Sequence, residues 1–239
     1  MTAVVPLSLR AENLTLLRGS RPLFTQLGFL VKSGEALILR GANGSGKTSL
    51  LRVLAGLTQA DEGVIIFDES VCKTASVQLR QSALYLGHAN ALKDDLTTAE
   101  NLADALSFDG VTVTEERQVG ALEKVGLLPR RHLPARQLSQ GQKRRIGLAR
   151  LVLADKPLWL LDEPTNALDA DGVALFTRII DEHLLAGGMA CIATHLSIQI
   201  DAQLRELRLD EQASLESPQV TASATSAEIN EAARAAEVA

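Results

Sequence analysis

Short apolar runs bounded by turn-forming residues occur in both the first and the last third of the chain, a pattern typical of β-strands. In the first third it predicts strands over residues 8–17, 27–31, 36–39, 64–67 and 83–86. Residues 48–57 have the pattern of a helix instead. Strands are predicted again over 158–161 and 189–193, with a helix near 172–185 between them. Continuous apolar runs of this kind indicate strands that are covered on both faces.

The middle of the chain has a helical pattern. Residues 101–106 and 121–127 predict two helices. Capping boxes are present at Thr97–Glu100 and Ser139–Gln142. In a capping box, the residue that begins a helix and the residue three positions later each accept a hydrogen bond from the other's backbone N–H. The second box predicts a third helix. We therefore expect an α/β core with a mostly helical insert at about residues 89–152.

Length and composition are typical of a single globular domain followed by a tail. The chain has 239 residues, of which 46% are hydrophobic, and that length suits one domain with a sizeable core. We expect this domain to span residues 1–210. Residues 211–239 are rich in Ala, Ser, Thr and Glu, and we expect this tail to be disordered.

Charge and cysteine content exclude several classes of protein. The formal net charge is −5, and residues 211–239 carry five acids and one arginine, so the rest is nearly neutral. Electrostatic binding of nucleic acid needs a strongly basic face, so we expect no nucleic-acid partner. Cys72 and Cys191 are too few and too far apart for structural zinc, and two thiols suit a reducing compartment. The longest uncharged stretch, residues 184–200, is too short to span a membrane. Residues 1–10 lack a signal-peptide pattern, so we expect any membrane association to come through a partner.

One loop has the spacing of a phosphate-binding site. Residues Gly41–Thr48 match G-x-x-x-x-G-K-[ST], between an expected strand and an expected helix. Glycines let the backbone approach phosphate oxygens, while amide N–H groups and the helix N-terminus supply partial positive charge. Lys47 adds a full charge, and the Thr48 hydroxyl is placed to ligate Mg²⁺. The expected nucleotide-binding residues here are Gly41, Asn43, Gly44, Ser45, Gly46, Lys47, Thr48 and Ser49.

Two acidic residues follow a later apolar run. The strand predicted over 158–161 is followed at once by Asp162 and Glu163, and ligands bind at the carboxyl ends of parallel strands. Asp162 is expected to hold Mg²⁺, directly or through water. Glu163 is expected to accept a proton from an attacking water, as a general base. Together with the phosphate loop, these residues predict hydrolysis of a nucleoside triphosphate.

Three further motifs resemble those of ABC transporter ATPases. Leu138–Gln142 reads LSQGQ and resembles the family signature LSGGQ. Asn166–Asp169 follows Glu163 as the family's D-loop does, and His195 follows a strand at the place of its switch histidine. Residues 8–209 therefore resemble an ABC ATPase domain. The resemblance implies a P-loop NTPase fold with a RecA-like core, N-terminal antiparallel strands and a helical insert.

The resemblance also implies a mechanism. ABC domains work as head-to-tail homodimers that close around two ATP molecules with Mg²⁺. The signature would then serve the nucleotide of the opposite subunit. The further nucleotide-binding residues implied are Ser139, Gly141, Gln142 and Asp169. His195 would contact the γ-phosphate in its own subunit and act in catalysis beside Glu163.

Several stretches resemble one subfamily, the ATP-binding subunits of cytochrome c maturation haem exporters (CcmA). They are residues 18–24, 43–56, 85–88, 93–102, 142–151 and 157–164. His88 stands where most ABC domains have a glutamine that contacts Mg²⁺ and the membrane partner, so we count it among the nucleotide-binding residues. The usual adenine-stacking aromatic is missing, and the Arg18 guanidinium could stack on the base instead. Ala91 and the pair Thr165-Asn166 depart from the subfamily pattern.

For this subfamily the resemblance implies ATP hydrolysis that drives haem export or haem-chaperone release in c-type cytochrome biogenesis. It also implies an integral membrane subunit as partner and a peripheral position on the cytoplasmic side of the bacterial inner membrane. We expect no direct haem binding by this chain, because its histidines lack a Cys-x-x-Cys-His context. The exported substrate stays open. The alternatives are the ATPase of another ABC transporter and a soluble ABC ATPase of the iron–sulfur assembly type.

Overall fold

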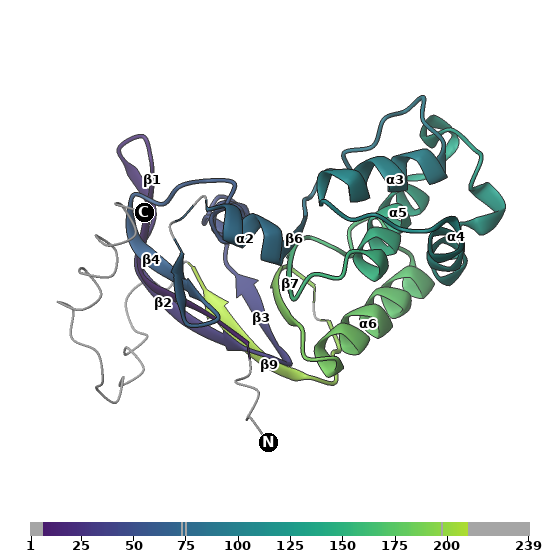
Figure 1. Ribbon diagram of the computed structural model, residues 1–239. Coiled ribbons are helices and arrows are strands. Elements are labelled where there is room, and N and C mark those ends of the chain that lie inside the picture. The colour runs from purple at the N-terminus through teal and green to yellow at the C-terminus, as the bar shows by residue number, and fades with distance from the viewer. Residues whose placement is uncertain (1–6, 73, 75, 197, 210–239) are drawn as a thin grey trace, which may run out of the picture.

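The structure is a computed structural model, and it describes residues 7–72, 74, 76–196 and 198–209. Two β-sheets lie side by side, and a group of helices projects beyond the second sheet (Figure 1). The expectation of a disordered tail over 211–239 lies outside the described residues. Among the described residues, no helix has both the length and the apolar character that crossing a bilayer requires.

The first sheet is antiparallel and has the order β2-β1-β4-β5. Its strands are β1 (Ser8–Arg18), β2 (Arg21–Lys32), β4 (Glu62–Phe67) and β5 (Ser70–Cys72). The sequence predicted that this strand begins at residue 27, but β2 begins at Arg21. Pro22 indicated a turn, but it is tolerated here because β2 is an edge strand, where a missing N–H donor costs no interior ladder hydrogen bond.

The second sheet is parallel throughout and has the order β6-β7-β8-β3-β9. Its strands are β3 (Glu35–Arg40), β6 (Ala83–Leu86), β7 (Leu158–Asp162), β8 (Met189–Ala193) and β9 (Gln203–Arg208). Every residue of β7 and β8 is buried. The carboxyl ends of β3, β7 and β8 therefore meet at one edge, where loops that follow them can converge.

The helices divide between the sheets and a separate helical part. Beside the sheets lie α1 (Lys47–Leu54), α2 (Val77–Ser82) and α6 (Ala170–Leu185). The helical part contains α3 (Thr98–Phe108), α4 (Glu115–Lys124), α5 (Gln140–Leu153) and two 3₁₀ turns (Leu128–Arg130 and Ala135–Gln137). Both predicted capping boxes form, at the starts of α3 and α5. Figure 1 shows α3, α4 and α5 grouped on the side away from the antiparallel sheet.

Side chains of the parallel sheet alternate between two hydrophobic cores. Leu158 and Leu160 of β7 pack in a core shared with the antiparallel sheet and α1. Trp159 and Leu161 face the opposite core, which α5 and α6 help to form. A strand that is covered on both faces needs apolar side chains at every position, and this explains the continuous apolar runs.

The sequence missed β5, α2 and β9, and it misplaced the start of α4 as well as that of β2. β5 and α2 are only three and six residues long, too short for a periodic pattern to emerge. β9 is held by backbone pairing with β3, and Leu207 is the buried residue among mainly polar, exposed ones. α4 starts at Glu115 and not at residue 121, because its first turns are charged and Thr114 caps them.

The half-buried His183, stacked on the buried Trp159, predicts that the protein loses stability in acid. The ring centroids lie 3.7 Å apart, and burial lowers the pKa of His183 from 6.5 to about 4. Below pH 6.5 the unfolded chain takes up a proton that the native chain does not. We expect this group's contribution to the free energy of unfolding to fall by about 1.4 kcal/mol per pH unit between pH 6.5 and 4.

The measurement is urea unfolding between pH 4 and 7.5, with His183→Phe as the control. Phenylalanine keeps a ring beside Trp159 but does not titrate. The variant should show a shallower loss of stability in acid than the wild type. Equal pH slopes for the two proteins would contradict the prediction.

Candidate active site

The phosphate loop leads from β3 into α1, as the sequence predicted. Gly41, Gly44 and Gly46 have φ values of 140°, 83° and 101°, a region that glycine adopts without the strain of a side chain. A Cβ on Gly46 would also lie 3.3 Å from Leu23 and Phe24. The loop is therefore built on glycines for conformation and for space.

Polar groups of the loop are arranged for an anion. The Lys47 ammonium donates to the carbonyls of Gly41 and Ala42, at 2.7 and 3.0 Å, so it lies over the loop. The Ser45 hydroxyl is buried and has no hydrogen-bond partner among the described residues. A buried hydroxyl without a partner is costly, and a phosphate oxygen would satisfy it. The first N–H groups of α1 have no partner within the helix either.

Thr48 and Asp162 come together at the end of the loop. The Thr48 hydroxyl donates to Asp162 Oδ2 at 2.9 Å, and Asp162 is only 3% exposed. Mg²⁺ is commonly held by one or two protein oxygens together with waters and substrate phosphates. This pair therefore fits Mg²⁺ in the presence of a nucleotide. Within the described ranges, no cluster of three or more His, Cys, Asp or Glu side chains offers a metal site made of protein ligands alone.

Adjacent strands place Glu163 against His195. Asp162 of β7 pairs with Ala193 of β8, and the Glu163 N–H donates to the Ala193 carbonyl at 2.8 Å. The residues that follow each strand therefore lie together. Glu163 Oε1 is buried and lies 3.3 Å from His195 Nε2, an ion-pair distance without hydrogen-bond alignment. Glu163 also has a left-handed backbone, with φ at 48°, and such conformations concentrate at functional sites.

Arg40, which the sequence analysis missed, fixes the loop that carries His195. Its Nη1 donates to the carbonyls of Thr194 and Leu196, at 2.7 and 3.1 Å. These carbonyls flank His195 on both sides. The signal was available in principle, since Arg40 directly precedes the phosphate loop, but its partners lie about 150 residues further along the chain.

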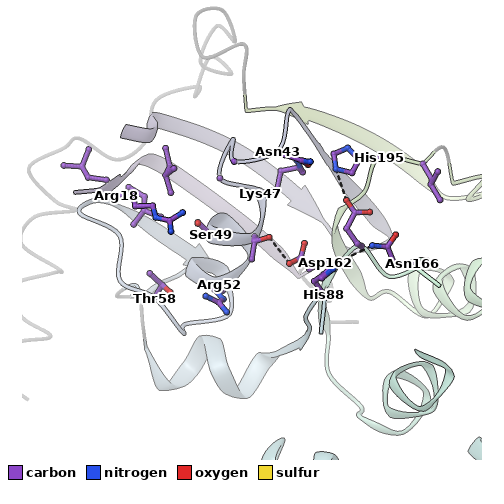
Figure 2. Close-up of a pocket in the computed structure, with 18 residues that line it drawn as sticks. Arg18, Asn43, Lys47, Ser49, Arg52, Thr58, His88, Asp162, Asn166 and His195 are labelled. Atoms are coloured by element: carbon purple, nitrogen blue, oxygen red, sulfur yellow. Dashed lines mark hydrogen bonds and ion pairs between the residues drawn. The ribbon is translucent and has the colours of Figure 1, made fainter. Parts of the chain in front are cut away.

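The phosphate loop, the end of β7 and the His195 loop meet at one open cleft with a volume of about 890 Å³ (Figure 2). The predicted site residues along it are Asn43, Gly44, Gly46, Lys47, Thr48, Ser49, His88, Asp162, Glu163 and His195. His88 meets Asn166 across a distance of 3.4 Å between Nδ1 and the amide nitrogen. Gly41 and Ser45 belong to the loop but are not lining residues of the cleft.

The far end of the cleft was largely missed by sequence reasoning. Figure 2 shows Arg18, Arg52 and Thr58 at the end of the cleft opposite His195 and Asn166. The other lining residues that were not predicted are Leu16, Leu17, Leu23 and Leu196. Arg18 was expected as a stacking partner for the base, and it does lie here. The others come from β1, β2, α1 and loops, and no motif marks them.

The signature residues are absent from the cleft lining of their own chain. Ser139 and Gln142 cap the start of α5, and the D-loop residue Asp169 caps α6 and pairs with Arg145 at 3.0 Å. The N–H of Gly172 and the Arg145 guanidinium lower the pKa of Asp169. A Cβ on Gly141 would lie 2.8 Å from the Ala167 carbonyl, so the signature packs closely on the D-loop. The signature thus packs against the D-loop outside the cleft, while the first D-loop residue, Asn166, lines the cleft.

A phosphate loop between a buried parallel strand and a helix, with Asp162 and Glu163 at the carboxyl end of another strand of the same sheet, defines a P-loop nucleoside triphosphatase. The sequence model of the family described as ABC transporter matches residues 24–166. This chain belongs to the ABC transporter family, and it is an ATP-binding and ATP-hydrolysing subunit.

Relatives of known name are similar along most of their length. A cytochrome c biogenesis ATP-binding export protein CcmA from Dechloromonas aromatica is 48% identical, over 84% of this chain and 99% of its own length. The protein of the same name from Vibrio cholerae is 41% identical, over 84% of this chain and 98% of its own.

Solved structures share the fold. An ATP-binding protein of a putative ABC transporter from Pyrococcus furiosus superimposes with a TM-score of 0.74 at 23% identity, and the match covers 87% of this chain and all of that one. A dimeric bacterial ABC transporter cassette gives a TM-score of 0.72 at 22% identity, over 84% of this chain and 94% of that one.

Proposed function

We propose that this chain hydrolyses ATP with Mg²⁺ to drive haem export, or release of a haem-loaded chaperone, in c-type cytochrome biogenesis. The observation that carries the proposal is the agreement over nearly full length with relatives that are named as cytochrome c biogenesis export proteins, at 41–48% identity. The alternative transporters and the soluble assembly ATPase have no comparable observation in their favour.

The cleft supports hydrolysis by a directly attacking water. Lys47 and the loop amides hold the phosphates. Glu163 accepts the proton of a water as that water attacks the γ-phosphorus, and the bond to ADP breaks. His195, held against Glu163, contacts the γ-phosphate. Bound Mg²⁺, on Thr48 and Asp162, would neutralise the phosphate charge.

A second copy of the chain completes the site in this proposal. Ser139, Gly141, Gln142 and Asp169 lie outside the cleft of their own chain, while the amides at the start of α5 are suited to an anion. In a head-to-tail homodimer these residues would bind the ATP of the opposite subunit. Closure on ATP and opening after hydrolysis would then move the membrane partner.

The membrane side of the proposal rests on the relatives. An integral membrane subunit would anchor the dimer to the cytoplasmic face of the bacterial inner membrane, and His88 would lie near that partner. Haem binding stays with other subunits. Titrating haem into the purified chain should give no tight stoichiometric spectrum.

Deleting the gene tests this function. The deletion strain should lack c-type cytochromes, measured by haem-dependent peroxidase staining of its proteins after electrophoresis. The wild-type gene should restore them, whereas Lys47→Ala at equal protein level should not, because phosphate binding is lost. Normal c-type cytochromes in the deletion strain would contradict the proposal. Co-purification with a soluble scaffold in place of an integral membrane protein would favour the assembly-type alternative.

A further inference from the structure

Arg144 is a fully buried arginine within the stretch 142–151 that resembles the haem-exporter subfamily, and no role has been given to it above. It lies on α5, five residues after Ser139, and is only 2% exposed. A guanidinium group has five N–H donors in a fixed plane. Each of the five has an acceptor in this structure, contributed by two separate segments of the chain.

Three of the acceptors are consecutive backbone carbonyls at the end of β7. Nη2 donates to the carbonyls of Asp162 and Glu163, at 3.0 and 2.8 Å, and Nε donates to the carbonyl of Pro164 at 3.0 Å. Glu163 adopts its left-handed backbone within this segment. Strained backbone persists only where its surroundings fix it. Here the Arg144 side chain binds the carbonyl of Glu163 and the carbonyls of the residues before and after it.

The other two acceptors lie in the loop that carries His88. Nη1 donates to the Gly87 carbonyl at 2.8 Å, and it has a longer contact of 3.5 Å with Asn90 Oδ1. His88 lies between these two partners in the sequence. One guanidinium therefore connects the helix that begins at the signature, the segment of Glu163 and the loop of His88.

A buried charge of this kind is costly for folding. Desolvation lowers the pKa of Arg144, while the negative charges of Asp162 and Glu163 oppose that shift. Well-packed apolar residues can often replace a buried charge without loss of stability. Fold stability alone thus gives a weak reason for an arginine at this position, and its contacts suggest a role in the site.

We propose that Arg144 is a positioning residue for ATP hydrolysis: by binding the three carbonyls of residues 162–164, it orients the Glu163 carboxylate toward the cleft. This inference rests on the proposed role of Glu163 as the general base. Arg144 acts through the backbone and does not touch the nucleotide.

The test compares Arg144→Lys with Arg150→Lys in the full-length chain. Lysine keeps the charge but has three donors in place of five. Arg150 is the matched control, because it lies on the same helix and binds Asp109 and the Tyr85 carbonyl but no atom of residues 162–164. Both variants should lower the Tm. We expect kcat to fall roughly tenfold or more only for Arg144→Lys, with KM for ATP within about twofold.

A double-mutant cycle separates positioning from general damage. With Glu163→Gln in place, there is no base left to orient, so adding Arg144→Lys should lower the residual rate by less than about twofold. Should Arg144→Lys not fold, Arg144→Gln takes its place in both comparisons.

Two results would overturn the proposal. One is an unchanged kcat in Arg144→Lys, and the other is an equal fold-loss of rate when Arg144→Lys is added to the wild type and to Glu163→Gln. Near-normal turnover in Glu163→Gln alone would instead overturn the role of Glu163 in the proposed function.

Discussion

Replacing Glu163 with glutamine is expected to lower ATP turnover by at least about 100-fold, because the general base is lost. Glutamine has nearly the same shape, so the fold and the phosphate loop should be unaffected. ATP binding should be retained, and the protein should accumulate as an ATP-bound dimer. Steady-state phosphate release and size-exclusion chromatography with Mg²⁺-ATP measure the two effects.

The matched control for this experiment is Glu182→Gln. Glu182 is an exposed acid on α6 that pairs with Lys124 at 2.5 Å, and neither of these residues lines the cleft. Its turnover should equal that of the wild type. Near-normal turnover in Glu163→Gln would show that another group accepts the proton.

Introducing Ser139→Asp into the Glu163→Gln protein should strongly weaken the ATP-dependent dimer. Aspartate is as good a helix cap as serine, so α5 should keep its start. A carboxylate facing the γ-phosphate of the opposite subunit would repel it, and like-charge contacts at an interface cost several kcal/mol. We expect ATP-dependent association to weaken at least about tenfold, while ATP binding to the monomer is unchanged.

Thr114→Asp supplies the control for this change. Thr114 is the N-cap of α4 in the same helical part, and it receives the same new charge away from the signature. This variant should still form the dimer in the Glu163→Gln background. Retention of the dimer in the Ser139→Asp variant would contradict the role of the signature across the interface.

Local chemistry explains which parts of the site could be predicted from sequence. The phosphate loop depends on residues that are consecutive in the chain, so its spacing identifies the loop, Lys47 and Thr48. Asp162 and Glu163 follow a strand that must be apolar throughout, and this marks the end of β7. The capping boxes of α3 and α5 are also local, and both formed as predicted.

Elements whose formation depends on distant partners were harder to predict. β9 has few buried side chains and exists because β3 offers it a parallel edge. The end of the cleft near Arg18 and Arg52 combines side chains from different elements, with no shared motif. Subfamily assignment depended on resemblance, since composition and periodicity carry no information about an exported substrate.

Periodicity and motif spacing were sufficient for the α/β class, the phosphate loop and the acidic strand end, because each depends on neighbours in the chain. Folding alone brings Glu163 to within 3.3 Å of His195, and gathers the carbonyls of residues 87 and 162–164 around Arg144. These contacts arise from strand order and helix packing. They join segments that no local interaction connects, so their geometry is a property of the folded chain.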